Sequence, residues 1–342
     1  NAQSELREFI EKADMPAGCT LLGLSALPTE HPLNKGMLGM HGNLGPNINT
    51  NKCDVLIAVG MRFDDRVTGN LATYAKQAKV IHFDIDPAEV NKNVKVDVAV
   101  LGDCKETLAS VTKLLKKNTH TEWIDSFKEY EKVEEEKVIR PELHPATNSL
   151  SMGEVVRAVS DATHHEAVLV TDVGQNQMIS ARYFKYTKER SIITSGGLGT
   201  MGYGLGASIG AKMGCPEKTV VNIAGDGCFR MNMNEIATAA RYQIPIVQVV
   251  VNNHVLGMVR QWQNLFYNQH YSQTILDDAV DFVKLAQALG AEGIRVTTKE
   301  EFADAFAKAV KMQRPVVLDC QIDQDDKVWP MVAPGAAISE VF

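Results

Sequence analysis

Two short apolar runs frame a helical segment in the second half of the chain. Residues 220–224 form the first run, which ends in a Gly-Asp-Gly turn around Asp226. Residues 245–251 form the second, which ends in two asparagines, the latter being Asn253. Between them, residues 231–241 carry apolar side chains at helical spacing, so the segment predicts a parallel βαβ unit with buried strands. We therefore expect Asp226 and Asn253 at the carboxyl ends of two strands, where open α/β sheets bind ligands.

Similar runs continue on both sides of this unit. We expect strands at residues 19–22, 54–59, 80–85, 94–101, 167–171, 191–194, 293–296 and 315–320. Helices are expected at 5–13, from 103 to 116, at 123–133, after a capping box at 151–154, before Gly290 and after Thr298. The alternation predicts the fold class α/β, with two doubly wound parallel-sheet domains.

We expect a first domain at residues 1–115, a linker helix and connection at 116–150, and a second domain at 151–342. Pro141 and Pro145 are predicted to end the linker helix, because proline lacks the amide that a helix interior needs.

Composition narrows the class of protein. The 342 residues are 45% hydrophobic and 23% charged, which is typical of globular domains with their own cores. A net charge of −7 argues against nucleic acid or an anionic membrane as partner, and no apolar run reaches the length of a membrane span. Six scattered cysteines without a C-x-x-C pair favour a reducing compartment. The chain starts at Asn1 without a methionine, so we expect it to be part of a longer gene product.

The spacing of the two turns gives the first chemical signal. Asp226 and Asn253 offer oxygen ligands that suit Mg²⁺, and flanking glycines let a bulky anion approach the backbone. Either turn alone is commonly a plain loop. Here, however, 24 residues separate Gly227 from Asn252. GDG followed at that interval by NN resembles the signature of thiamine diphosphate (ThDP) enzymes. The resemblance implies that Asp226, Asn253 and the carbonyl of Val255 hold Mg²⁺ on the diphosphate.

A competing hypothesis lies in residues 197–202, Gly-Leu-Gly-Thr-Met-Gly. They match G-x-G-x-x-G after a predicted strand and before a helix, and Asp226 ends the next strand. That arrangement is typical of an NAD-dependent oxidoreductase. It would leave Gly227 and Asn253 without a role. A third interpretation is that the glycines serve only close packing of a helix on the sheet.

In the first half, arginines and acids cluster in loops after predicted strands. Arginines beside a Gly-rich turn suit a phosphate-bearing ligand, and an acid such as Asp84 at a strand end can accept from ribose hydroxyls. The alternative is a salt-bridged surface loop.

Five segments carry a closer resemblance: GMLGMHG, RFDDRVTG, DIDPAEV, SGGLGTMGYGLG and LGMVRQWQNLFY. Together they resemble the catalytic subunit of anabolic acetohydroxyacid synthase (acetolactate synthase), and the resemblance runs through the whole chain. It implies that residues 1–115 are part of a central FAD-binding domain and that 151–342 form the ThDP- and Mg²⁺-binding pyrophosphate domain. The family's N-terminal pyrimidine-binding domain, with its activating glutamate, has no match in this chain. Asn176 and Gly206 stand where the family usually has histidine and proline.

The resemblance also implies site residues. The flavin contacts would be Thr20, Leu21, Met40, His41, Gly60, Arg62, Asp64, Arg66, Val67, Asp84, Ile85 and Asp103. The ThDP contacts would be Gly174, Gln175, Asn176, Gly199, Met201, Gly225, Asp226, Gly227 and Cys228. Met201, Gln175 and Trp262 would serve catalysis, with Met201 as an apolar wedge against the cofactor and Trp262 lining the pocket for the second keto acid. A buried core methionine and a packing tryptophan are the alternatives.

The activity implied is ThDP-dependent decarboxylation of pyruvate and its joining to pyruvate or 2-ketobutyrate, in branched-chain amino acid biosynthesis, with FAD in a structural role. The family's partners would be further copies of the same chain, in a homodimer or homotetramer with the active site at the subunit interface, and a regulatory small subunit. We expect these 342 residues alone to be inactive. Another ThDP-dependent 2-keto acid decarboxylase or oxidase, or a non-catalytic cofactor-binding fragment, stays open. The compartment expected is the cytoplasm of a bacterial or archaeal cell, or an organelle in a eukaryote.

Overall fold

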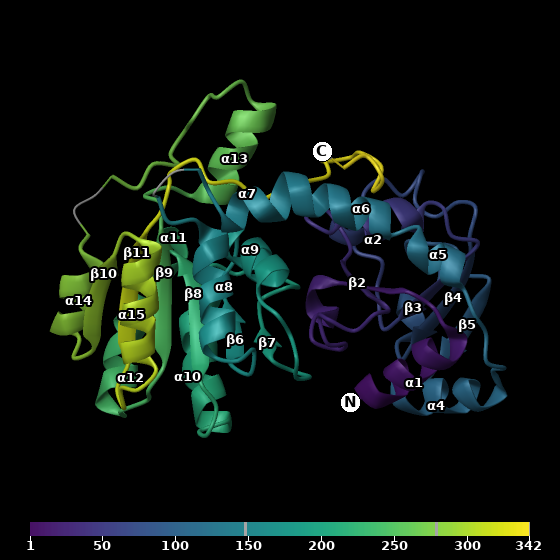
Figure 1. Ribbon diagram of the computed structural model, residues 1–342, viewed down its shortest axis with the longest axis horizontal. Coiled ribbons are helices and arrows are strands. Elements are labelled where there is room, and N and C mark those ends of the chain that lie inside the picture. The colour runs from purple at the N-terminus through teal and green to yellow at the C-terminus, as the bar shows by residue number, and fades with distance from the viewer. Residues whose placement is uncertain (147–148, 278–279, 342) are drawn as a thin grey trace. The chain divides into compact units, whose positions relative to one another are not determined.

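The computed structural model describes residues 1–146, 149–277 and 280–341 and divides into two compact units (Figure 1). Unit 1 comprises residues 1–139 and 329–341, and unit 2 comprises residues 140–328. Every strand pair in their sheets is parallel, which confirms the predicted α/β class. Residues 147, 148, 278, 279 and 342, which belong to the expected linker and second domain, lie outside the described residues. Within the described ranges, no helix is long and apolar enough to cross a membrane.

Unit 2 is built on one six-stranded sheet with the order β10-β11-β9-β8-β6-β7. Its strands are β6 (Val168–Thr171), β7 (Ile192–Ile193), β8 (Val220–Gly225), β9 (Val247–Asn252), β10 (Glu292–Val296) and β11 (Val316–Gln321). Its helices are α7 (Arg140–Leu143), α8 (Met152–Ala162), α9 (Gln175–Tyr183), α10 (Tyr203–Gly214), α11 (Asp226–Phe229), α12 (Ile236–Arg241), α13 (Gly257–Phe266), α14 (Phe282–Ala288) and α15 (Lys299–Ala309).

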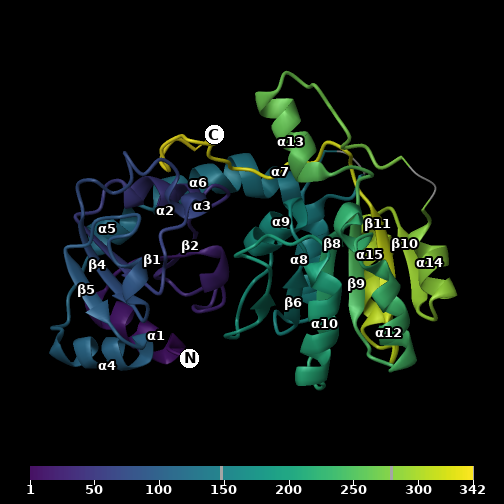
Figure 2. The same ribbon diagram turned by 180° about the vertical axis from the view of Figure 1, so that it is seen from behind.

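Both faces of this sheet are covered, so its central strands are buried throughout. Helices α8 and α15 lie in front of the strands in Figure 1, and α10 and α12 lie in front of them in Figure 2. The apolar core on the second face includes Leu205 of α10, Ile236 of α12 and Phe282 of α14, packed on Val220 and Val250. All residues of β9 are buried, as the continuous apolar run predicts.

The helix predicted at residues 231–241 is only partly formed. Asn232 has extended φ of −150°, and its side-chain Nδ2 donates to the carbonyl of Gly202 at 2.5 Å. A single 3₁₀ turn, Met233–Glu235, follows before α12 begins. The apolar periodicity was correct, but a side-chain bond to a neighbouring loop interrupts the helical backbone.

Unit 1 contains a three-stranded sheet, β3-β4-β5, and a two-stranded sheet, β1-β2. The strands are β1 (Ala17–Cys19), β2 (Asn34–Met37), β3 (Val55–Val59), β4 (Lys79–Asp84) and β5 (Val98–Leu101). The helices are α1 (Gln3–Ala13), α2 (Leu44–Thr50), α3 (Asp65–Thr68), α4 (Cys104–Leu114), α5 (Thr121–Asp125) and α6 (Lys128–Glu134), with 3₁₀ turns at Leu21–Gly23 and Pro87–Glu89.

Alternate residues of the strands in unit 1 face two separate cores. Phe83 faces α1 and α4, whereas Val80 faces a cluster that includes Tyr74, Val332 and Ile338. The C-terminal segment thus covers one face of this sheet, and Gly69 and Ala337 form an antiparallel bridge. The expected division placed the whole of 151–342 in one domain; the structure instead packs residues 329–341 on unit 1.

The expected helix stop at Pro141 is not observed. After α6 the chain forms a π-helical turn, Glu135–Ile139, and continues into α7, which contains Pro141. A wide turn of this kind tolerates a residue without an amide hydrogen, because the regular i→i−4 bonding is already interrupted there.

Candidate functional site

Asp226 is the first residue after β8 and begins the short helix α11. Its side chain is 1% exposed, and its Oδ2 has no hydrogen-bond partner among the described residues. Burial raises the pKa of Asp226 to about 6. A buried carboxylate oxygen without a partner is costly in the folded protein, so this atom indicates a position for a cation.

The turn after β9 lies at the same edge of the sheet, since β8 and β9 are neighbours with Gly225 opposite Val251. Asn253 is 5% exposed, and its Oδ1 accepts from the backbone nitrogen of Val255 at 3.3 Å. His254 between them adopts a left-handed φ of 58°. The turn therefore holds one amide oxygen and one backbone carbonyl in a fixed, buried loop.

A third loop joins these two at the start of α9. Gly174 has a φ of 108°, which favours glycine, and Gln175 and Asn176 follow it in buried positions. The amide of Asn176 donates to Val173 O at 3.0 Å, while its Oδ1 has no partner among the described residues. The Oε1 of Gln175 lies 3.5 Å from Asn253 Nδ2, so the loops after β6 and β9 touch.

Close packing leaves no space for side chains at two glycines of these loops. A Cβ on Gly227 would lie 2.6 Å from Leu256, and one on Gly257 would lie 1.9 Å from Gln175 Oε1. Nearby, the Cys228 thiol donates to Val173 O at 3.0 Å, and burial raises the pKa of this thiol, which keeps it neutral. The three loops, with the unpartnered oxygens of Asp226 and Asn176, fit Mg²⁺ and a diphosphate group.

The glycine-rich segment 197–202 does not bind a dinucleotide in the way the NAD hypothesis requires. Asp172, 1% exposed, accepts from Gly202 N at 2.9 Å and from Gly204 N at 3.0 Å. These amides at the start of α10 are the groups that would receive a pyrophosphate. A carboxylate of the chain itself occupies them, so the structure contradicts the NAD alternative.

Met201 and Trp262 both face open space in unit 2. Met201 is 37% exposed, so it is not the buried core methionine of the alternative interpretation. Its Cε would lie 3.7 Å from a Cβ on Gly227. Trp262, on α13, lines an open groove of about 700 Å³ together with Met258, Phe266 and others. Its indole Nε1 has no partner among the described residues.

The predicted flavin residues lie in unit 1, mostly after the carboxyl ends of strands. Gly60 (φ 60°) donates to Phe83 O at 2.8 Å, and Gly102 donates to Asp84 O at 3.0 Å, so the loops after β3, β4 and β5 are adjacent. Arg62 forms an ion pair with Asp64, and its side chain is 54% exposed.

The other predicted flavin residues take more varied places. Met40 N donates to Arg66 O at 2.7 Å, and both residues line a pocket of about 220 Å³ next to Val332. Val67 belongs to α3, next to Arg66. Three are side-chain caps or exposed positions: Thr20 caps a 3₁₀ turn, Asp103 caps α4, and Ile85 is 71% exposed. His41 is buried, and Leu21 belongs to the turn that Thr20 caps.

Two contributors to the site were not predicted from the sequence. Asp172 directly follows the strand expected at residues 167–171, and its role depends on contacts 30 residues away along the chain. Gln261 was not singled out, although its Oε1 accepts from Gln175 Nε2 at 3.1 Å and from Val328 N at 3.0 Å. Gln175 also donates to Asp326 O at 2.8 Å, so its amide nitrogen is used within the protein. The signal available in the sequence was the position of Gln261, which directly precedes the predicted site residue Trp262.

Comparisons with known proteins agree with this geometry. Residues 172–320 match the family described as thiamine pyrophosphate enzyme, C-terminal TPP binding domain. Residues 1–111 match the thiamine pyrophosphate enzyme central domain. Thiamine pyrophosphate is another name for ThDP, and the C-terminal match includes Asp226, Asn253 and Val255.

Acetolactate synthase large subunits are similar over almost the whole chain. The isozyme 2 large subunit of Escherichia coli K12 is 43% identical over 337 residues, 98% of this chain and 60% of that protein. The Corynebacterium glutamicum large subunit is 42% identical over 351 residues, covering 100% of this chain and 55% of that protein. A probable acetolactate synthase large subunit of Methanocaldococcus jannaschii is 41% identical over 350 residues, with shares of 99% and 58%. The chain thus spans 55–60% of the length of these relatives. On both domain matches and these identities, it belongs to the thiamine pyrophosphate enzyme family.

Proposed function

We propose that this chain provides the ThDP- and FAD-binding parts of an acetolactate synthase. The reaction would be decarboxylation of pyruvate followed by joining to a second 2-keto acid, either pyruvate or 2-ketobutyrate. The observation that carries the proposal is the unpartnered, buried Oδ2 of Asp226 beside the turn of Asn253 and Val255. It occurs in a chain about as similar to bacterial as to archaeal acetolactate synthase subunits.

The residues of unit 2 would hold the cofactor and its metal. Asp226, Asn253 Oδ1 and the carbonyl of Val255 would bind Mg²⁺, because carboxylate and carbonyl oxygens are its preferred protein ligands. Gly174, Gly225, Gly227 and Cys228 would contact the diphosphate, with Asn176 and Gly199 nearby, and the Oδ1 of Asn176 would face the bound cation. Bound ThDP would supply the electron sink that decarboxylation needs and that no side chain provides.

Other residues of unit 2 would orient the reactants. Met201 projects an apolar side chain beside Gly227, where it would pack against the bound cofactor and help to orient it. Gln175, bonded to Gln261 and Asp326, would position the loop rather than contact substrate. Trp262 and Met258 would form the apolar wall for the second keto acid and exclude water from it.

Unit 1 would bind FAD at the loops after β3, β4 and β5. The exposed guanidinium of Arg62 suits a phosphate, and the carboxylates of Asp84 and Asp103 at strand and helix ends suit ribose hydroxyls. FAD would act as a structural group. A homodimer or homotetramer, a regulatory small subunit and a cytoplasmic location are further parts of the proposal.

Two measurements test the proposed function. In calorimetry, ThDP should bind the protein with Mg²⁺ present and not with EDTA. The second measurement uses a chimera. In it, the part of the Escherichia coli isozyme 2 large subunit that has no counterpart in this chain is fused to residues 1–342. We expect this chimera, with ThDP, Mg²⁺, FAD and pyruvate, to form acetolactate, whereas residues 1–342 alone should not. A folded chimera that binds ThDP but forms no acetolactate would contradict the activity, and absence of Mg²⁺-dependent ThDP binding would contradict the cofactor assignment.

A further inference from the structure

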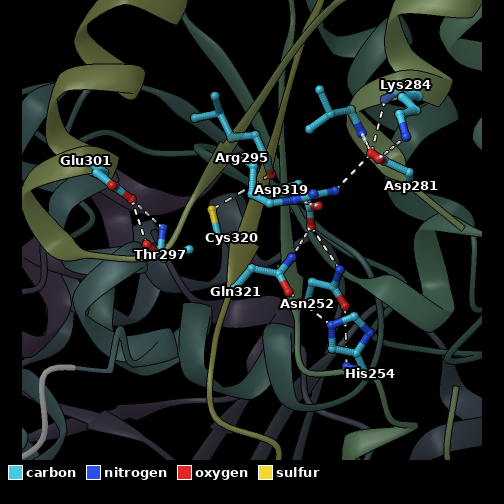
Figure 3. A network of polar contacts seen from close by, with 12 residues as sticks. Asn252, His254, Asp281, Lys284, Arg295, Thr297, Glu301, Asp319, Cys320 and Gln321 are labelled. Carbon is cyan, nitrogen blue, oxygen red and sulfur yellow. Dashed lines mark hydrogen bonds and ion pairs between the residues drawn. The ribbon is translucent and has the colours of Figure 1, made fainter. Parts of the chain in front are cut away.

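A buried carboxylate lies behind the turn of Asn253 and Val255. Asp319, on β11, is fully buried, and its Oδ1 accepts from Asn252 Nδ2 at 2.9 Å and from Gln321 Nε2 at 2.8 Å. Figure 3 shows Asp319 between Arg295 on one side and Asn252 and Gln321 on the other. β11 is paired with β9 in register, with Gln321 opposite Asn252, so these contacts come from adjacent strand ends.

The side chain of Asn252 connects Asp319 to the turn that follows β9. Its Oδ1 accepts from the backbone nitrogen of His254 at 3.3 Å, and His254 Nε2 lies 3.0 Å from Gln321 Oε1. The left-handed φ of 58° at His254 is unfavourable for a residue with a side chain and needs support from its surroundings. Both supports, the Asn252 side chain and Gln321, are held by the same oxygen of Asp319.

The charge of Asp319 is balanced on its other side. Arg295 Nε donates to Asp319 Oδ2 at 3.0 Å, and Arg295 Nη2 donates to Asp281 Oδ1 at 2.9 Å. Asp281 in turn caps α14 through the backbone nitrogens of Val283 and Lys284. A buried carboxylate is tolerated when it is paired and fully hydrogen-bonded, as here. The Asp319 side chain thus accepts three hydrogen bonds, from Asn252, Gln321 and Arg295, and cannot rotate to another arrangement without losing one.

We propose that Asp319 is a positioning residue for the metal site: through Asn252 it fixes the turn from which Asn253 and Val255 would reach Mg²⁺. The proposal rests on the proposed function and deepens it. Asp319 itself would touch neither metal nor cofactor. Residues that orient metal ligands from behind commonly change metal affinity by about 10- to 100-fold when they are altered.

The test measures the Mg²⁺ concentration that half-saturates ThDP binding, by calorimetry at fixed ThDP. We expect Asp319→Asn to raise that concentration about 10- to 100-fold, because an amide cannot accept from Asn252, Gln321 and Arg295 together. Asn252→Ala, which removes the link at its other end, should give a shift of similar size. The double variant Asn252→Asp with Asp319→Asn restores a donor and an acceptor with the charge exchanged, and should return the value toward wild type.

Asp281→Ala is the matched control, because it removes the other partner of Arg295 and the cap of α14, while Asp281 forms no direct bond to Asn252. It should lower the melting temperature while leaving the Mg²⁺ dependence unchanged. Equal Mg²⁺ half-saturation in wild type and Asp319→Asn, or equal shifts in Asp319→Asn and Asp281→Ala, would overturn the inference. Failure of the wild-type protein to bind ThDP with Mg²⁺ would instead overturn the proposed function.

Discussion

The two units present their candidate sites in opposite ways. In unit 2 the residues proposed for the metal are buried: Asp226 is 1% exposed, Val255 2% and Asn253 5%. In unit 1, Arg62 has a side chain 54% exposed and Ile85 is 71% exposed. A buried site is fixed before its ligand binds, whereas exposed side chains must be ordered by the ligand at a cost in free energy. The same chain therefore contains one preorganised site and one that its ligand would complete.

The sheets explain this difference. Helices cover both faces of the six-stranded sheet in unit 2, and the loops after its central strands pack on one another. The three-stranded sheet of unit 1 has less cover, and Val98 and Leu101 of its edge strand β5 are half exposed. The two units also differ in the pKa values of their carboxyl groups. Among the described residues, all three carboxyl groups whose pKa is raised by burial, Glu142, Asp226 and Asp326, lie in unit 2.

The largest effect is expected at Asp226. Asp226→Ala removes the charged residue proposed as a metal ligand, so Mg²⁺-dependent ThDP binding should fall below detection in calorimetry. The free energy of unfolding at pH 8 should not fall, because burial already raises the pKa of Asp226 to about 6 and makes its ionised form unfavourable. Urea denaturation checks this second part. Retained ThDP affinity would remove Asp226 from the metal site, and a clear loss of stability would show that the carboxylate is structural.

The sequence was sufficient to predict where Asp226 lies, directly after a buried strand, for a specific reason. Asp226 and Asn253 follow continuous apolar runs, and such runs fix the carboxyl ends of buried parallel strands without any knowledge of strand order. Asp319 and Asn252 could not be paired in this way. Their contact depends on β11 inserting between β9 and β10, a neighbour relation that the order of strands along the chain does not give.

Unit 1 was harder to predict for a related reason. One face of its three-stranded sheet is covered by residues 329–341 from the far end of the chain. Local pattern assigned that segment to the domain next to it in sequence, since a long-range return has no periodic signal. Pro141 failed as a stop signal because a π-helical turn, which depends on tertiary context, precedes it.

The second effect concerns pH and sharpens the contrast in burial. Glu142 Oε1 accepts from Gly153 N at 2.6 Å, and burial, aided by Asp326, raises the pKa of Glu142 from 4.5 to about 7. The folded protein therefore binds this proton more tightly than the unfolded chain. Its contribution to stability is full below pH 4.5 and is lost as the pH rises through about 7.

Glu142→Gln keeps the acceptor for Gly153 and removes the charge. Its free energy of unfolding should match wild type near pH 4.5 and exceed it by about 1–3 kcal/mol at pH 8, measured by urea denaturation across pH. Glu217→Gln, at an exposed position of unit 2, serves as control and should leave the profile unchanged. If the free energy of unfolding depended on pH in the same way in wild type and Glu142→Gln, burial would not raise the pKa of Glu142, and the contrast with unit 1 would fail for this group.

A third effect concerns the open groove of unit 2, which lies between the two extremes of burial. Trp262→Leu removes an apolar wall, and recognition of one extra methylene is worth about 1–3 kcal/mol, or roughly 10- to 200-fold. In the active chimera, the preference for 2-ketobutyrate over pyruvate should fall in a competition assay, while ThDP affinity stays the same. Met213→Leu, an exposed apolar change outside the groove, is the control. Equal loss of both products would assign Trp262 to packing.

The smallest effect is expected in unit 1, where binding and folding should separate. Arg62→Ala removes an exposed guanidinium whose ion-pair partner, Asp64, still caps α3 through Arg66 N at 3.0 Å. Surface changes of this kind usually alter stability by less than about 0.5 kcal/mol, so the melting temperature should hold. Loss of a charge-assisted bond to a phosphate should weaken FAD binding by about tenfold or more, seen by flavin fluorescence titration. Arg7→Ala, an exposed arginine on α1, controls for net charge. Unchanged FAD affinity would leave the arginine as part of a surface ion pair, and a lower melting temperature would mean that this edge of unit 1 is as tightly coupled to folding as the buried site of unit 2.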